Sequence, residues 1–169
     1  MKTMIKILTA AFALAFGMGG CIDEKTTDEN HLPMGTPWPE FTVSGPSGTV
    51  TEADFDGRRT LIVLFRTTCG DCKRELPGVQ KAWERFGGED GFRLAAISKE
   101  DASVVAKYWE DNEYTMPYYI DANGAAFTAF DVNYVPTLYL FCSSGIVAYV
   151  AVEKAEQFKN LIEHIEELP

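Results

Sequence analysis

The chain is poor in basic residues, with 15 Lys and Arg against 25 Asp and Glu, which leaves a formal net charge of −10. Nucleic-acid binding needs clustered Lys and Arg to neutralise phosphates, so this deficit excludes a nucleic-acid partner. Four cysteines are too few for a disulfide-built mini-protein, while 46% hydrophobic residues exclude a disordered chain. The length of 169 residues instead suits one domain with a real core and a small appendage.

The apolar run near the amino terminus is too short to span a bilayer. Residues 7–16 form this uncharged, largely apolar run after two lysines, whereas a spanning helix needs about 20 such residues. This order, completed by small residues, predicts a secretory signal peptide over residues 1–20. The small residues lead directly to Cys21 as in a bacterial lipobox, so we expect Cys21 to be lipidated. The alternative is ordinary cleavage near Gly20 with a free Cys21 thiol.

The residues after Cys21 are polar and charged up to about residue 31, with little to bury. They predict a flexible tether over residues 21–34, between the lipid and the folded domain. The lipid anchor would attach the protein to a membrane. The expected location is therefore the periplasmic side of a bacterial cell envelope.

The hydrophobic pattern of residues 35–169 predicts one α/β domain. The unbroken apolar run Leu61–Phe65 is typical of a central parallel strand that is covered on both faces. Apolar residues at steps of three and four predict an amphipathic helix over residues 70–86. The other expected strands are 41–43, 92–97, 118–120, 138–142 and 146–152, and the other expected helices are 102–112, 125–131 and 153–168. This order predicts an α/β sandwich around a mixed sheet.

The sequence Cys-Gly-Asp-Cys at residues 69–72 stands where the buried strand ends and the helix begins. The unpaired N–H groups and the positive end of the helix dipole stabilise a thiolate at such a position. We therefore interpret Cys69 as an exposed nucleophile. Cys72, one turn further in, is placed to attack a disulfide that Cys69 forms, which is thiol–disulfide exchange. The cysteine pair is then itself the redox centre, and we expect neither a cofactor nor a metal.

Two other interpretations of the cysteine pair are half of a zinc site and an inert disulfide. A zinc site needs further ligands, and Cys142, His31 and His164 are scattered without ligand spacing. A disulfide that closes a two-residue loop restrains the unfolded chain very little. Both interpretations are therefore weaker than redox chemistry.

Pro136 precedes the expected strand at residues 138–142. Proline cannot donate a hydrogen bond to a sheet, so its presence here needs a structural reason. A cis Val135–Pro136 bond would supply one, and it would present the Val135 backbone to an extended substrate peptide. The alternative is an ordinary trans proline at the entrance of a strand.

Together these motifs resemble the thioredoxin fold and, more narrowly, the TlpA/ResA-type membrane-tethered thiol-disulfide oxidoreductases. The matching stretches are residues 39–43, 54–58, 69–77, 121–124 and 135–137. The resemblance implies a thioredoxin-like three-layer sandwich with a mixed central sheet, an N-terminal β-hairpin and a helix-strand insertion. It places the nucleophile at Cys69, the resolving thiol at Cys72 and the cis-proline at Pro136. We expect substrate contacts at Val135, Pro136 and Thr68, and Thr68 stands where the family usually has an aromatic residue.

The sequence lacks the buried acid that thioredoxin has near its cysteine pair. Val63 occupies the place of the buried acid of thioredoxin. Glu75, three residues after Cys72, matches an acid of the family and is the best remaining candidate for proton transfer with the resolving thiol. The alternative is a surface carboxylate in a helical salt bridge, but the positions one helical turn away from Glu75 offer no cation.

The resemblance implies an extracytoplasmic enzyme that reduces disulfides of client proteins and is fed by a membrane electron donor. An oxidase or isomerase is the nearest alternative, because direction depends on reduction potentials. A peroxidase normally has Thr or Ser three residues before its reactive cysteine and Pro four before that, and Arg66 and Ile62 occupy these positions. A binding lipoprotein without turnover is disfavoured by the intact cysteine pair.

Lipidation of Cys21 can be tested by metabolic labelling with a radioactive fatty acid. We expect the wild-type chain to carry the label and Cys21→Ser to carry none, because the substitution removes the sulfur to which the lipid is attached. Cys142→Ser is the matched control and should be labelled like the wild type. An unlabelled wild-type chain, or equal label on wild type and Cys21→Ser, would contradict the predicted anchor.

Overall fold

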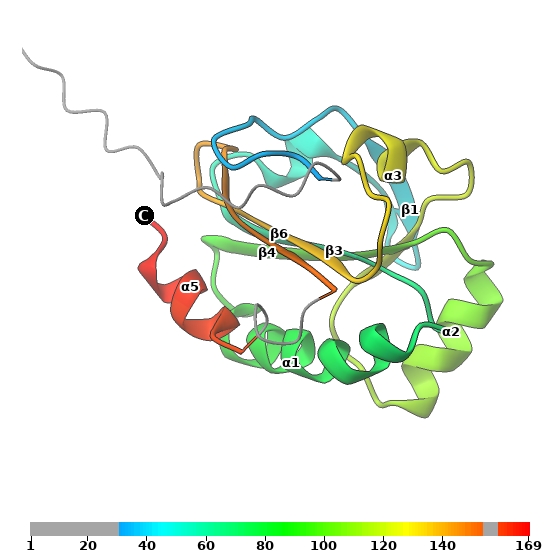
Figure 1. Cartoon of the computed structure of the whole chain (residues 1–169). Coiled ribbons are helices and arrows are strands. Elements are labelled where there is room, and N and C mark those ends of the chain that lie inside the picture. Colours follow the sequence, from blue (N-terminus) through cyan, green and yellow to red (C-terminus); the bar gives the residue numbers. More distant parts are fainter. Residues whose placement is uncertain (1–30, 154–158) are drawn as a thin grey trace, which may run out of the picture.

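The computed structural model describes residues 31–153 and 159–169 (Figure 1). The predicted signal peptide and Cys21 lie outside the described residues. The strands are β1 (Thr42–Gly45), β2 (Gly48–Thr51), β3 (Arg59–Phe65), β4 (Phe92–Ser98), β5 (Tyr118–Ile120), β6 (Thr137–Phe141) and β7 (Val147–Val152). The helices are α1 (Gly70–Phe86), α2 (Ala102–Asp111), α3 (Ala125–Ala129) and α5 (Leu161–Glu167), with a short 3-10 turn at Glu52–Phe55.

The described strands form one mixed seven-stranded sheet in the order β2-β1-β5-β4-β3-β6-β7. β4 runs parallel to both β3 and β5, whereas β6 is antiparallel to β3. Figure 1 shows α1, α2 and α5 below the sheet and α3 above it, which is the predicted three-layer sandwich. The predicted N-terminal hairpin is β1–β2, and α2 with β5 forms the predicted helix-strand insertion.

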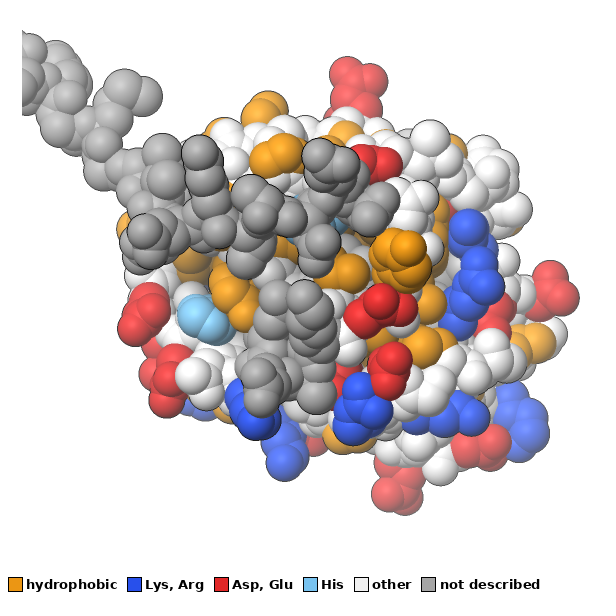
Figure 2. Space-filling model, viewed as in Figure 1, with side chains coloured by type: hydrophobic (Ala, Val, Ile, Leu, Met, Phe, Trp, Pro, Cys, Tyr) orange, Lys and Arg blue, Asp and Glu red, His pale blue; other side chains and the backbone are white. Residues whose placement is uncertain are grey.

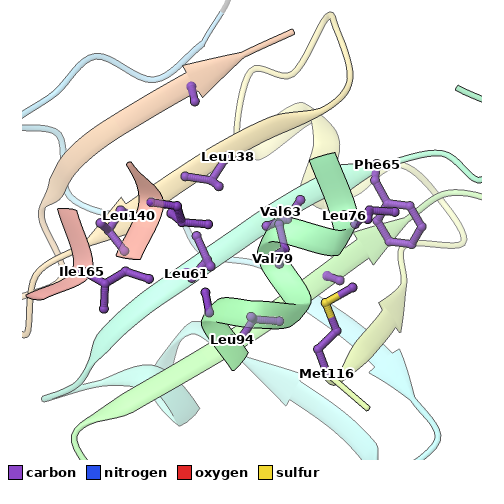
Figure 3. Close-up of a cluster of buried hydrophobic side chains, with 14 of the residues drawn as sticks. Leu61, Val63, Phe65, Leu76, Val79, Leu94, Met116, Leu138, Leu140 and Ile165 are labelled. Atoms are coloured by element: carbon purple, nitrogen blue, oxygen red, sulfur yellow. The ribbon is translucent and has the colours of Figure 1, made fainter. Parts of the chain in front are cut away.

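The central strand β3 is buried on both faces, as its unbroken apolar sequence predicts. Successive side chains of a strand point to opposite faces. Leu61, Val63 and Phe65 therefore join the core against α1 and α5, whereas Ile62 and Leu64 join the core on the α3 side. Figure 3 shows the first core, with side chains of β3 packed beside those of α1. Because both faces are filled, the chemistry can lie only at an end of this strand.

The buried side chain of Gln80 binds helix α1 to the loop before β5. Its Oε1 accepts hydrogen bonds from the backbone N–H groups of Thr115 and Met116 at 3.0 and 3.1 Å. Its Nε2 donates to the Thr115 hydroxyl at 2.8 Å. These bonds join α1 to the loop before β5, so the helix that follows Cys69 is held at its middle as well as at its start.

The predicted helix over residues 153–168 is wrong at its first residue, Glu153. Glu153 has a φ of 52° and its N–H donates to the Pro136 carbonyl at 3.0 Å, so it ends β7 instead of starting a helix. Residues 154–158 lie outside the described residues, and the described helix begins only at Leu161. An acidic residue suits the start of a helix, but here the backbone contact to the loop before β6 overrides that preference.

The ordered domain begins before residue 35, so the predicted tether over residues 21–34 extends too far. His31 is buried, and the N–H of Leu32 donates to the Tyr139 hydroxyl at 3.1 Å. Leu32 and Met34 pack against the core on the α3 side. Apolar side chains spaced by two within a polar segment therefore bind it to the domain. No helix within residues 31–153 and 159–169 is long and apolar enough to cross a membrane.

Candidate active site

Cys69 is the N-cap residue of α1. Its backbone is extended, with φ −77° and ψ 126°, and its sulfur accepts a hydrogen bond from the N–H of Cys72 at 3.4 Å. An N-cap side chain commonly binds an unpaired N–H of the first helical turn, and here a sulfur does so. The half-buried Cys69 thiol therefore lies at the positive end of the α1 dipole.

The loop before β6 meets Cys69 from the other side. The Val135–Pro136 bond is cis, as the sequence predicts. The Cys69 thiol donates a hydrogen bond to the Val135 carbonyl at 3.3 Å, although the two residues are 66 positions apart. Val135 is half-buried, and its neighbour Tyr134 is 48% exposed. The residues predicted to contact a substrate peptide are thus adjacent to the predicted nucleophile.

Cys72 is fully buried, and both cysteines of the pair are free thiols in this structure. Burial raises the pKa of the Cys72 thiol strongly, because a thiolate loses its hydration there. One interaction acts the other way: the N–H of Arg66 donates to the Cys72 sulfur at 3.5 Å. Near neutral pH Cys72 is therefore a protonated thiol that must lose its proton before it can attack.

Glu75 has a cationic partner that the sequence analysis did not find. Arg74 donates from Nε to Glu75 Oε1 at 2.9 Å and from Nη2 to Asp71 Oδ1 at 2.6 Å. The statement that Glu75 lacks a partner was wrong, because a long guanidinium can fold back along the helix to its sequence neighbour. The Glu75 side chain is only 11% exposed. It lies on the helix one turn beyond Cys72.

Two further predicted positions near the cysteine pair differ in exposure, since Thr68 is exposed and Val63 is buried. Thr68 is exposed directly before Cys69. Val63 is buried in the core with Leu138, so an apolar side chain stands where thioredoxin has its acid. The structure therefore brings Cys69, Cys72, Val135 and Pro136 together, with Thr68 at the rim.

The surface around the helix carries both cations and acids, and Arg74 and Arg85 are paired with carboxylates. Figure 2 shows Lys and Arg side chains along the lower part of this face, where Figure 1 places α1. The exposed cations of this helix are Lys73, Arg74, Lys81 and Arg85. Positive charge near a helix N-terminus favours a thiolate.

The Glu100 carboxylate binds the loop before Cys69, although no sequence motif indicates this residue. Glu100 Oε2 accepts from the N–H of Thr67 at 2.6 Å, and Glu100 Oε1 accepts from the Thr67 hydroxyl at 2.9 Å. Glu100 follows β4, and Thr67 follows β3. The carboxyl ends of adjacent parallel strands lie at the same edge of a sheet, so the strand order contained the signal.

The Cys142 thiol and the His164 ring lie away from the cysteine pair. Cys142 is buried at the far end of β6 from Pro136, where its sulfur contacts the Ser144 hydroxyl at 3.2 Å. His164 on α5 stacks against the Tyr149 ring with centroids 4.1 Å apart. The prediction that Cys142 is a buried core residue is confirmed.

Comparison with known proteins places residues 34–150 under the AhpC/TSA family model. The thiol:disulfide interchange protein DsbE of Pseudomonas aeruginosa is 30% identical over 139 residues, 77% of this chain and 74% of that protein. The thiol-disulfide oxidoreductase ResA of Bacillus thuringiensis subsp. konkukian is 25% identical over 139 residues, 81% of this chain and 79% of that protein.

Among solved structures, a thiol:disulfide interchange protein of the thioredoxin family from Chlorobium tepidum TLS superposes with a TM-score of 0.69. It shares 21% sequence identity, and the alignment covers 79% of this chain and 95% of that one. This likeness supports the fold.

The different surroundings of the two thiols predict different reactivity towards iodoacetamide. In the reduced, folded protein near pH 7 we expect Cys69 to be carbamidomethylated and Cys72 to stay unlabelled, because burial and a raised pKa keep Cys72 protonated. Since the pKa is raised, labelling of Cys72 should grow only at strongly alkaline pH. Peptide mapping by mass spectrometry identifies the site. Cys72 labelling at neutral pH, with Cys69→Ser as control, would contradict this assignment.

Proposed function

Because the chain belongs to the AhpC/TSA family and has the thioredoxin fold, we propose that it is a thiol-disulfide oxidoreductase whose dithiol is Cys69 and Cys72. The single observation that carries this proposal is the position of the Cys69 sulfur. It caps α1, accepts from the N–H of Cys72 at 3.4 Å and lies 3.3 Å from the Val135 carbonyl. A half-exposed nucleophile with a buried thiol one turn behind it is the arrangement that disulfide exchange needs.

In the reducing direction the Cys69 thiolate attacks one sulfur of a client disulfide. A Cys69–client disulfide forms, and the second client sulfur leaves as a thiolate and takes up a proton. Cys72 then loses its proton and attacks the Cys69 sulfur, which releases the first client sulfur. The client disulfide gains two electrons and two protons, and Cys69 and Cys72 end as a disulfide.

The loop before β6 is the proposed binding edge for the client chain. The Val135 backbone faces Cys69, and the adjacent Tyr134 is exposed. Main-chain groups at the entrance of a strand can pair with an extended peptide without reading its sequence. Thr68, small and exposed on the other side of Cys69, leaves room for a client residue.

Reduction is the proposed direction, with electrons from a membrane donor that reduces the Cys69–Cys72 disulfide after each turnover. The similarity to proteins named DsbE and ResA supports the assignment to this group of enzymes. The proposed location is the periplasmic side of the bacterial envelope, with lipidated Cys21 as the anchor. The leader and lipobox-like sequence support this part of the proposal.

Substitution of single cysteines tests the proposed roles. Cys72→Ser should accumulate mixed disulfides between Cys69 and client proteins, because the resolving thiol is absent, whereas Cys69→Ser should accumulate none. Non-reducing electrophoresis followed by mass spectrometry detects and identifies the adducts. Cys142→Ser, altered at a buried thiol far from the site, should behave like the wild type. Equal trapping by both variants of the pair would refute the assignment.

Glu75 is the proposed base for the resolving thiol, because a buried Cys72 with a raised pKa needs help to lose its proton near neutral pH. Glu75→Gln should slow resolution of a fluorescent mixed disulfide by up to about 100-fold, while attack by Cys69 changes far less. Stopped-flow fluorescence separates the two steps. Arg74→Gln is the matched control, since it breaks the ion pair and keeps the carboxylate. Equal slowing by both variants would make Glu75 a structural residue.

A further inference from the structure

The Glu100 carboxylate binds three donors at the edge of the sheet where β3 and β4 end. Besides the N–H and the hydroxyl of Thr67, it accepts from the Ser98 hydroxyl at 3.1 Å. Thr67 is 6% exposed and Ser98 is fully buried. The donor with the shortest distance is the Thr67 N–H, at 2.6 Å. The carboxylate thus binds the backbone of the loop that leads to Cys69.

The peptide group that Glu100 binds is the one that joins Arg66 to Thr67. On its other side, the Arg66 carbonyl accepts a hydrogen bond from the N–H of Cys69 at 3.3 Å. The preceding Arg66 N–H donates to the Cys72 sulfur at 3.5 Å. The Arg66 backbone therefore contacts both members of the cysteine pair, and Glu100 binds the N–H of the residue that follows Arg66.

We propose that Glu100 is a positioning residue for the resolving thiol, an inference that rests on the proposed oxidoreductase function. Its carboxylate fixes the Arg66–Thr67 peptide, and through the shared Arg66 Cα this holds the preceding peptide, whose Arg66 N–H donates to the Cys72 sulfur. When Cys72 loses its proton, that N–H becomes a hydrogen bond to a thiolate and stabilises it. A hydrogen bond to a charged group is stronger than one to a neutral group, so its alignment matters most in the resolving step.

A purely structural role for Glu100 has less support. β3 and β4 already pair along their whole length, from Arg59–Phe92 to Phe65–Ser98. The sheet therefore does not need a side chain beyond its last pair to hold these strands together. The contacts of Glu100 reach the loop residue Thr67, and through its peptide they reach the cysteines. A neutral Gln would bind the Thr67 N–H more weakly than the carboxylate does, because a hydrogen bond to a charged acceptor is stronger than one to a neutral carbonyl.

Other groups near Cys72 also act on its pKa. Cys69 and Asp71 raise its pKa from the same segment, and Cys72 in turn raises the pKa of Tyr108 on α2. Glu75, the proposed base, lies one turn further along α1. Glu100 acts on the thiol through the aligned peptide, so loss of its charge should not by itself make Cys72 more acidic.

The experiment measures how fast iodoacetamide labels Cys72 over a series of strongly alkaline pH values in full-length protein carrying Cys69→Ser. This readout needs no client protein, so it tests Glu100 even if the proposed function fails. Adding Glu100→Gln should slow the labelling about tenfold at each pH, because a rise of one pKa unit lowers the thiolate fraction tenfold. Glu110→Gln removes an exposed carboxylate of α2 and should leave the rate unchanged.

An equal or faster rate in Glu100→Gln would overturn the proposal, since a loosened structural contact exposes the thiol instead of making it less acidic. Thr67→Val provides a second variant if Glu100→Gln does not fold. It removes one of the two Thr67 donors and keeps the backbone N–H. A smaller slowing of Cys72 labelling in Thr67→Val supports the proposal, and an unchanged rate overturns it.

Discussion

The pairing of the buried strand β3 with a parallel strand on one edge and an antiparallel strand on the other decides where every reactive group lies. Parallel β4 ends beside the end of β3, so Glu100 lies next to the loop before Cys69. Antiparallel β6 begins beside the carboxyl end of β3, which brings the Val135 carbonyl to the Cys69 sulfur. Three segments that are distant in sequence thus meet at the carboxyl end of β3, one of the two ends that its core packing leaves available.

The two thiols differ because the helix exposes one and buries the other. Cys69 caps α1 and keeps contact with solvent, while Cys72, one turn on, has lost its hydration. The difficult step of disulfide exchange in this protein is therefore the deprotonation of Cys72. Two different acids serve that step in our proposals. Glu75 would take the proton, and Glu100 would hold the backbone N–H that stabilises the resulting thiolate.

One cation binds the two acids near the cysteine pair. Asp71, between the cysteines, disfavours a thiolate at Cys72, and Arg74 binds both Asp71 and Glu75. The Arg74–Asp71 pair is exposed and adds little stability. Its consequence is local, because the guanidinium offsets the negative charge on the surface beside the exposed nucleophile and orients the Glu75 carboxylate.

The sequence by itself determined the order and type of the elements around the core and the place of Cys69 at a helix start, whereas the cis state of the bond before Pro136 needed the structure. The first two features depend on local periodicity and on the chemistry of single residues. It did not predict the ion pair of Glu75, the contact of Leu32 and Met34 with the core or the late start of α5. Only the tertiary structure decided these, and with them the role of Glu100. A hydrogen bond between two strand ends depends on which strands are neighbours in the sheet, and no local pattern encodes that neighbourhood.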